Sequence, residues 1–278
     1  MNARALFLIA RQERVLAIRS RWIQIFAVVF ALLALAVAAS GYVLSGGHGV
    51  QDFARTAASL LQLVLLLVPL TALLIGVLSL APDRGAAELL FSQPVARRTI
   101  LLGKLLGLFE ALVAAQAVGF GAAGVVVFSQ SGDEGLRAFL ILGAASVTLT
   151  AVFLSLAAWL AATAIGRRRT RALALALVVW FVTVVLFDVA ALGLASLLPS
   201  GLASRVLIVA VLVDPVDGVR TAALLGIEGA AAFGAASLAF LRFTKGPWGA
   251  STLLGLSVLL WIAGPTLAAI TRLRKTDV

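Results

Sequence analysis

Six long apolar stretches constrain this chain more than any other feature of its sequence. They lie near residues 22–45, 57–80, 100–128, 138–165, 172–198 and 250–271. Each reaches the roughly 20 residues that a helix needs to cross a hydrocarbon layer about 30 Å thick. Hydrophobic residues make up 62% of the chain and charged residues 12%, against roughly 45–50% and 25% in soluble domains. We therefore predict an all-α polytopic membrane protein, with one transmembrane domain over residues 1–278.

The basic residues indicate how the six spans are oriented. Sixteen of the 22 lysines and arginines fall on one side of such a bundle: Arg4, Arg11, Arg14, Arg19, Arg21, Arg84, Arg97, Arg98, Lys104, Arg167, Arg168, Arg169, Arg171, Arg272, Arg274 and Lys275. The positive-inside rule places this side and both termini in the cytoplasm. A net charge of +10 would suggest nucleic acid in a soluble domain, but here the charge follows the membrane. We expect no nucleic-acid partner.

Two further segments decide the count of spans. Residues 1–21 interleave apolar side chains with arginines, which predicts a helix in the plane of the lipid headgroups; the alternative is a basic tail that only sets orientation. Residues 221–241 are long enough to span, but they are mostly Ala and Gly and carry Glu228. A seventh span would also move the basic C-terminal residues outside. We therefore expect 199–249 to be extracytoplasmic, with short helices on or dipping into the interface.

The loop at 81–99, between the second and third spans, combines an amphipathic piece, a proline and paired arginines. The wider sequence Asp83–Gly107 reads DRGAAELLFSQPVARRTILLGKLLG. Its short cytoplasmic helix and its charges indicate a docking surface for another protein. The residues that we assign to docking are Arg84, Glu88, Leu90, Phe91, Pro94, Arg97 and Arg98.

Three ionisable residues fall inside the predicted spans, where each costs at least about 2.5–3.5 kcal/mol to insert. Lys104 lies near the inner end of the third span and can extend to the headgroups. Glu110, two turns deeper, and Asp188 in the outer half of the fifth span either line a solute path or bond to a neighbouring helix. Gly103-x-x-x-Gly107 can allow another helix to approach the third span closely.

The densest polar cluster outside the spans is DPVDGVR, from Asp214 to Arg220. Proline after Asp214 favours an extended or turn conformation at that aspartate. Asp217 and Arg220 are three residues apart at a predicted helix start, which favours a local ion pair or a cap. The alternative is that Asp214, Pro215, Asp217 and Arg220 contact an extracytoplasmic partner.

Catalytic and metal-binding patterns are missing from the sequence. There is no cysteine, the one histidine is His48 in a glycine-rich turn, and no GxxxxGK[ST] phosphate-binding loop occurs. We therefore expect no enzyme activity, no catalytic residue, no metal site and no bound cofactor in this chain.

Over nearly its whole length the chain resembles a type-two ABC transporter permease, with six spans and a coupling loop after the second. Three stretches, 85–107, 176–194 and 213–229, are similar to the NosY-type permease subunits of the transporter for nitrous oxide reductase maturation. The third stretch matches a family pattern NP-x-D-x-x-R, with Asp214 in place of Asn. The first departs from the family, because SLAPDRG at 79–85 replaces a Tyr-Asp pair and an acidic run.

The resemblance implies a homodimer in a bacterial inner membrane, bound to two copies of a separate ATPase that carry the ATP and Mg²⁺. It also implies a periplasmic accessory protein and a role in copper-site assembly. Cu(I) prefers Cys and Met ligands, and the only such residue is Met1. A sulfur-containing cargo, or force without cargo, therefore fits better than a copper relay. The alternatives are a general exporter of lipid or drug, and a membrane scaffold or carrier that needs no ATPase.

Overall fold

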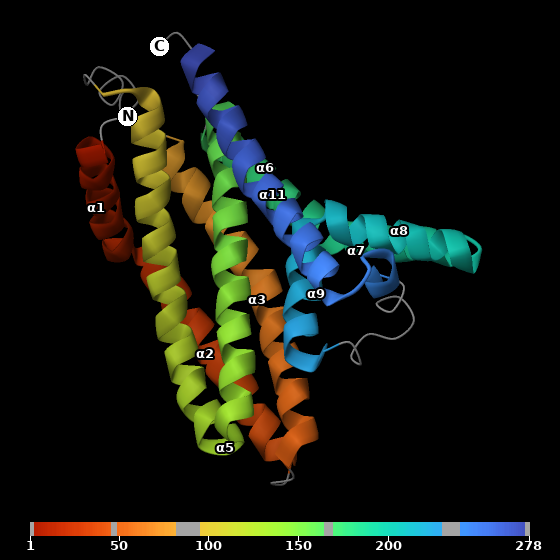
Figure 1. Cartoon of the computed structure of the whole chain (residues 1–278). Helices are drawn as coiled ribbons and strands as arrows, with labels where there is room; N and C mark the ends of the chain where they lie inside the picture. The colour runs from red at the N-terminus through yellow and green to blue at the C-terminus, as the bar shows by residue number, and fades with distance from the viewer. Residues whose placement is uncertain (1–2, 46–48, 82–94, 164–168, 230–239, 276–278) are drawn as a thin grey trace.

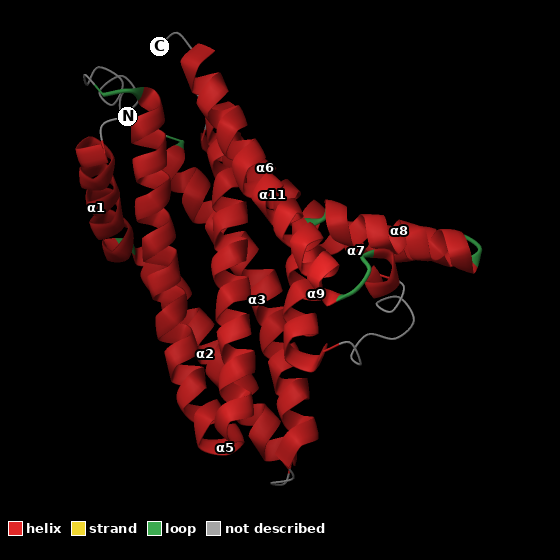
Figure 2. Cartoon of the chain, viewed as in Figure 1, coloured by secondary structure: helices red, strands yellow, loops and turns green. Residues whose placement is uncertain are grey.

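The computed structural model describes residues 3–45, 49–81, 95–163, 169–229 and 240–275, and this part of the chain is almost entirely helical (Figures 1 and 2). The helices are α1 (Ala3–Arg19), α2 (Arg21–Ser45), α3 (Gly49–Leu80), α5 (Arg97–Thr163), α6 (Arg169–Phe181), η1 (Val182–Leu186), α7 (Phe187–Ser196), α8 (Ser200–Val213), α9 (Pro215–Glu228) and α11 (Pro247–Lys275). Within the described residues there is no strand.

Six of these segments are long and apolar enough to cross a membrane, which confirms the predicted fold class. They are Arg21–Ser40, Thr56–Leu80, Arg97–Val125, Leu136–Thr163, Thr170–Ser196 and Pro247–Arg274. The third and fourth spans both belong to α5, which stays helical through the turn between them. Figure 1 shows α5 as two long limbs lying side by side and joined at one end. Helical hydrogen bonds keep backbone polar groups satisfied in lipid, which favours such unbroken segments.

The two limbs of α5 form the centre of the bundle, with α1, α2, α3 and α11 packed around them. Phe30 of α2 is fully buried and meets the ring of Phe120 edge-on, and Phe120 meets Phe139 on the other limb in the same way. Such edge-to-face pairs add about 0.5–1.5 kcal/mol each to the burial of their area. Gly119 lies directly against Phe30, so a Cβ at this position would collide with the ring.

A buried chain of polar side chains also joins the limbs of α5. Gln116 donates to the Thr150 hydroxyl at 2.8 Å and accepts from Ser146 at 2.7 Å. All three residues are almost completely buried. Hydrogen bonds of this kind between membrane helices contribute roughly 0.5–2 kcal/mol each.

A proline in α11 explains another contact between spans. Pro265 cannot donate to the carbonyl of Trp261, four residues earlier, because it lacks an N–H. Ser155 of α5 donates its hydroxyl to that carbonyl at 2.9 Å. The polar group freed by the proline is thus satisfied by a neighbouring span, as the membrane interior requires.

The fifth span contains a π-helical turn, η1, between α6 and α7. Beyond this turn, α7 and α8 pack against each other, and Figure 1 shows the pair extending sideways from the long helices. The chain then enters α9, which packs against α5, α11 and α3. α9 ends at Glu228, with Gly229 at φ 70° behind it, so the helix does not continue unbroken through residues 221–241. Residues 230–239 lie outside the described part of the chain.

Candidate functional site

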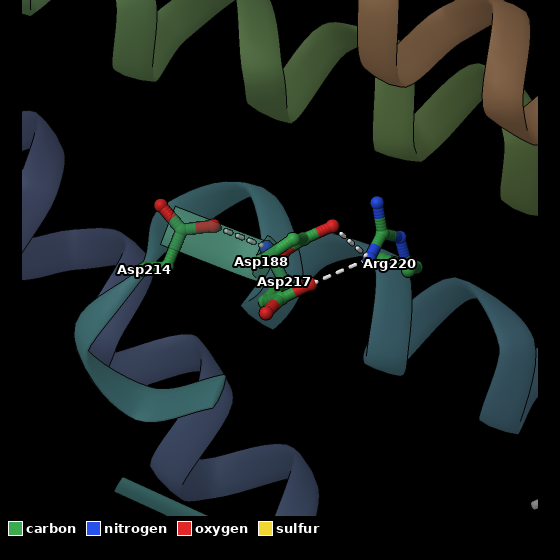
Figure 3. A network of polar contacts seen from close by, with 4 residues as sticks. All are labelled: Asp188, Asp214, Asp217 and Arg220. Carbon is green, nitrogen blue, oxygen red and sulfur yellow. Dashed lines mark hydrogen bonds and ion pairs between the residues drawn. The ribbon is translucent and has the colours of Figure 1, made fainter. Parts of the chain in front are cut away.

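Four charged side chains meet where α7, α8 and α9 converge (Figure 3). Arg220 of α9 is the central cation. Its Nη1 donates to Asp188 Oδ2 of α7 at 2.7 Å and to Asp217 Oδ1, one turn earlier on α9, at 2.8 Å. The fourth member is Asp214, between α8 and α9. We call these four residues the outer cluster.

The local sequence explains how this cluster is built. Asp214 is extended, at φ −88° and ψ 122°, as the following Pro215 favours. Its carboxylate accepts a hydrogen bond from the backbone N–H of Asp217 at 2.9 Å, so it caps α9, and Pro215 occupies the first turn. The predicted pair between Asp217 and Arg220 is confirmed. The sequence thus predicted the local half of the cluster correctly.

The environment of the cluster raises the pKa of Asp214 and of Asp217. Burial, with smaller contributions from the charges of Asp217 and Asp188, raises the pKa of Asp214 from 3.8 to about 7, while the hydrogen bond from the Asp217 backbone and the charge of Arg220 oppose the rise. Burial and the charge of Asp188 raise the pKa of Asp217 to about 6, against the attraction of Arg220. Two carboxylates pair with the one guanidinium and the buried Asp214 lies beside them, so protonation of Asp214 and Asp217 begins nearer to neutral pH than is usual for aspartate.

The cluster opens on a small cavity of about 250 Å³. Asp188, Asp217, Arg220 and Thr221 form its polar part, and side chains of α7, α8 and Phe240 form its apolar wall. One carboxylate oxygen from each aspartate lies within 4.8 Å of the others, a spacing that a metal ion could use. Arg220 already supplies the positive charge to two of these acids, however. The geometry suits a proton shared among acids and an internal counter-ion.

The structure places the two intramembrane acids in different polar clusters. Asp188 joins the outer cluster through Arg220, whereas Glu110 accepts a hydrogen bond from Arg14 of α1 at 2.8 Å. Sequence analysis did not foresee either basic partner. An acid inside a span needs a partner, and Arg220 is one of the few basic residues in the part of the sequence predicted to be extracytoplasmic. That requirement is the sequence signal that could have identified the pair.

A second polar cluster, missed by sequence analysis, joins α1 to the end of α3 and the beginning of α5. Glu13 of α1 is buried and accepts a hydrogen bond from the Ser79 hydroxyl of α3. Lys104 of α5 lies 3.5 Å from Glu13 Oε2 and donates to the Ser79 carbonyl at 3.0 Å. Lys104 thus bonds within the protein, where we expected it to extend to the headgroups. We call Glu13, Ser79 and Lys104 the inner cluster.

Only part of the predicted docking loop can be described. Arg84, Glu88, Leu90, Phe91 and Pro94 lie outside the described residues. Arg97 begins α5 and donates to the Leu273 carbonyl, near the end of α11, at 2.9 Å, and Arg98 is exposed. The ATPase-binding role of these residues stays a prediction.

Comparison with known proteins agrees with this architecture. Residues 7–278 match the family described as ABC-2 family transporter protein. The chain is 35% identical over 268 residues to the probable ABC transporter permease protein NosY of Pseudomonas aeruginosa, covering 94% of each chain. It is 34% identical over 237 residues to the protein of the same name from Stutzerimonas stutzeri, covering 83% of this chain and 85% of the relative. The chain is an integral membrane protein that belongs to the ABC-2 family of transporter proteins.

Proposed function

We propose that this ABC-2 permease works as a homodimer in a bacterial inner membrane and is driven by two copies of a separate ABC ATPase. Its task is to support copper-site maturation of nitrous oxide reductase from the periplasmic side. The observation that carries the proposal is the similarity to NosY permeases, which for the Pseudomonas aeruginosa protein extends over 94% of both chains. The six spans and the basic residues on one side of them support the proposed orientation, with both termini in the cytoplasm.

The scarcity of copper-binding side chains in the sequence bears on what the permease transports. Soft Cu(I) is held by thiolates and thioethers, and the sequence contains no cysteine and only one methionine, Met1. We propose that the permease exports a sulfur-containing species, or transmits force to a periplasmic accessory protein without cargo. Copper-dependent stimulation of ATPase activity in vesicles that hold only the permease and its ATPase would contradict this.

The outer cluster suits the extracytoplasmic end of such a mechanism. Asp214 and Pro215 are buried, so they hold the junction of α8 and α9 in shape. Asp217 and Arg220 are partly exposed beside the cavity and, through Asp188, tie α9 to the fifth span. We propose that movement of the spans reaches the periplasmic partner through this tie. On the cytoplasmic side, we assign ATPase docking to Arg84, Glu88, Leu90, Phe91, Pro94, Arg97 and Arg98.

One cavity favours a second candidate function, the export of a lipid or drug. It has a volume of about 560 Å³ and lies between the second limb of α5, α9 and α11. Small residues such as Ala144, Gly218 and Gly255 make the space, and its lining is mostly apolar. Cavities of this size accommodate drug-sized molecules. Stimulation of the partner ATPase by a lipid or drug, with no dependence on a periplasmic protein, would favour this function.

Co-purification of the ATPase tests the proposal most directly. The full-length permease, expressed from its native locus with an affinity tag, is solubilised and the bound subunits are identified by mass spectrometry. We expect a nucleotide-binding subunit in a one-to-one ratio with the permease. A permease that is always recovered without such a subunit, under conditions that keep a control ABC transporter intact, would show that it is a scaffold or carrier instead.

A further inference from the structure

α1 packs directly against the backbone of α5. A Cβ added to Gly103 would lie 2.8 Å from Ile9 Cγ2, and one added to Gly107 would lie 2.8 Å from Glu13 Cβ and collide with the Ala10 carbonyl. Real Cβ atoms do not approach so closely, so only glycine permits this packing. The Gly103-x-x-x-Gly107 pattern therefore serves contact between α1 and α5 within one chain.

Charged side chains also bind α1 to α3 and α5. Glu13 and Lys104 retain 10% and 20% of their side-chain exposure, whereas Arg14 and Glu110 retain 41% and 33%. Solvent screens the second pair, so its contribution is small. Loss of one partner from the first pair leaves a charge unpaired in a buried site, which is strongly unfavourable. The inner cluster therefore dominates the attachment, and the Arg14–Glu110 pair adds to it.

The inner cluster lies where the docking loop leaves and re-enters the bundle. α3 ends at Leu80, next to Ser79, and α5 begins at Arg97, two turns before Lys104. Lys104 contacts α3 and α1 at once, because it donates to the Ser79 carbonyl and faces Glu13. Displacement of the loop at 81–99 must therefore act on the helix ends to which α1 is bound.

We propose that Glu13 and Lys104 are positioning residues that clamp α1 to the loop-bearing ends of α3 and α5. α1 then moves with these ends as one unit when an ATPase displaces the docking loop. This inference rests on the proposed coupling to an ATPase. It differs from the expectation of a helix held only by lipid headgroups, because protein contacts and not the membrane surface set the position of α1.

Spin labels test the clamp in the intact complex. The chain has no cysteine, so cysteines at Leu8 of α1 and Ala114 of α5, both exposed, are the only attachment sites in the permease. The ATPase subunit is used without exposed cysteines. In nanodiscs assembled from labelled permease diluted with an excess of the cysteine-free protein, so that most complexes hold one labelled copy, we expect one narrow interspin distance, unchanged between the nucleotide-free and ATP-bound states. E13Q should add a second, broad distance from molecules in which α1 has detached from α5, and the population of these molecules should rise roughly tenfold or more.

Matched variants separate the clamp from a general loss of charge or folding. R11Q removes one charge from an exposed position on the same helix, and we expect no change in the distance. R14E should broaden the distance by a smaller factor, of about two- to fivefold in the detached population. The charge exchange R14E/E110R should restore the narrow distance. That restoration would support attachment of α1 by charge, whereas a wild-type distance that is already broad would overturn the clamp.

The stimulation of ATPase activity by the permease is the second measurement. We expect E13Q to keep the ATPase bound but to lower its permease-dependent stimulation, while R11Q matches the wild type. If the ATPase binds normally and E13Q changes neither the distance nor the stimulation, the clamp is wrong and the proposed function stands. If no ATPase binds the wild-type permease, the proposed function fails, whatever the distances show.

Discussion

Each residue of the DPVDGVR motif that carries a charge has a definable task in the structure. Asp214 caps α9, and Asp217 and Asp188 share the guanidinium of Arg220. A cap needs only an acceptor oxygen, which Asn supplies as well as Asp. Burial raises the pKa of Asp214 to about 7, so this aspartate is about half neutral at pH 7 and largely neutral below it, and it can then cap the helix as an Asn would.

The variant D214N should therefore remove a pH dependence without removing the cap. Because the pKa of Asp214 is higher in the folded protein than its ordinary 3.8, folding takes up a proton, and stability falls as pH rises from about 4 to about 7. Because D214N lacks this titrating group, we expect its free energy of unfolding to rise by about 1–3 kcal/mol relative to that of the wild type between pH 4 and pH 7. Thermal unfolding in nanodiscs at several pH values measures this, and D214A, which loses the cap, is the control. A constant difference between D214N and the wild type would contradict the expectation.

Removal of the central cation should destabilise the same region strongly. R220Q leaves Asp188 and Asp217 without their shared counter-ion, and we expect a loss of about 2–4 kcal/mol at pH 7. The loss should shrink toward pH 5, because Asp217, with a pKa of about 6, then becomes neutral. Chemical unfolding of the purified protein at the two pH values measures both effects. The double variant D188N/R220Q should recover part of the loss, and no recovery would argue against the pair.

At the scale of elements, close packing around α5 explains why so many small residues occur in the spans. Gly103 and Gly107 receive α1, and Gly119 receives Phe30 of α2. Lipid provides no hydrophobic drive for association between helices, so backbone proximity and hydrogen bonds such as those of Gln116 hold the spans together.

Two glycines on the same limb of α5 provide a matched test of this packing. A Cβ at Gly119 would collide with the buried ring of Phe30, whereas a Cβ at Gly121 meets nothing within 4 Å. Both substitutions to alanine gain about 1 kcal/mol of helix propensity. We expect G121A to leave the free energy of unfolding unchanged or to raise it, and G119A to lower it by about 1–3 kcal/mol. Melting temperatures in one detergent compare them, and equal shifts would show that Phe30 moves aside easily.

At the scale of the whole molecule, the fifth and sixth spans are much less covered by protein than the second and fourth. Only 17% of the fifth and of the sixth span is buried, against 56% of the second and of the fourth. Exposed apolar side chains on these spans must be covered by lipid or by another chain. A second copy of the permease, as proposed, is the natural cover for part of this surface.

Orientation can be tested with one introduced cysteine, because the chain has none of its own. Arg98 is exposed at the start of α5, so a cysteine there should react with an impermeant maleimide only from the cytoplasmic side. A cysteine at Leu197, which is 83% exposed near the end of α7, should react only from the periplasmic side. Labelling of intact cells and inverted vesicles compares the two, and the reverse pattern would overturn the proposed topology.

Sequence analysis predicted local contacts well and distant ones poorly. The pair between Asp217 and Arg220 and the extended Asp214 follow from residues three or fewer positions apart. The pair between Arg14 and Glu110 joins residues 96 positions apart, and no periodicity in the sequence connects them. The pair between Glu13 and Lys104 joins α1 to α5, and nothing in the sequence of α1 itself indicates that Lys104 lies opposite Glu13.

The sequence by itself determined the number of spans and the all-helical class, because lipid demands long apolar segments that satisfy their own backbone hydrogen bonds. The distribution of arginines also predicts a side for each loop, since charges resist crossing the membrane. Only the tertiary structure decided which polar groups meet: Asp188 with Arg220, Glu13 with Lys104, and Ser155 with the carbonyl freed by Pro265. These pairings depend on how the helices pack and rotate against one another, and that arrangement is set by contacts spread over the whole bundle.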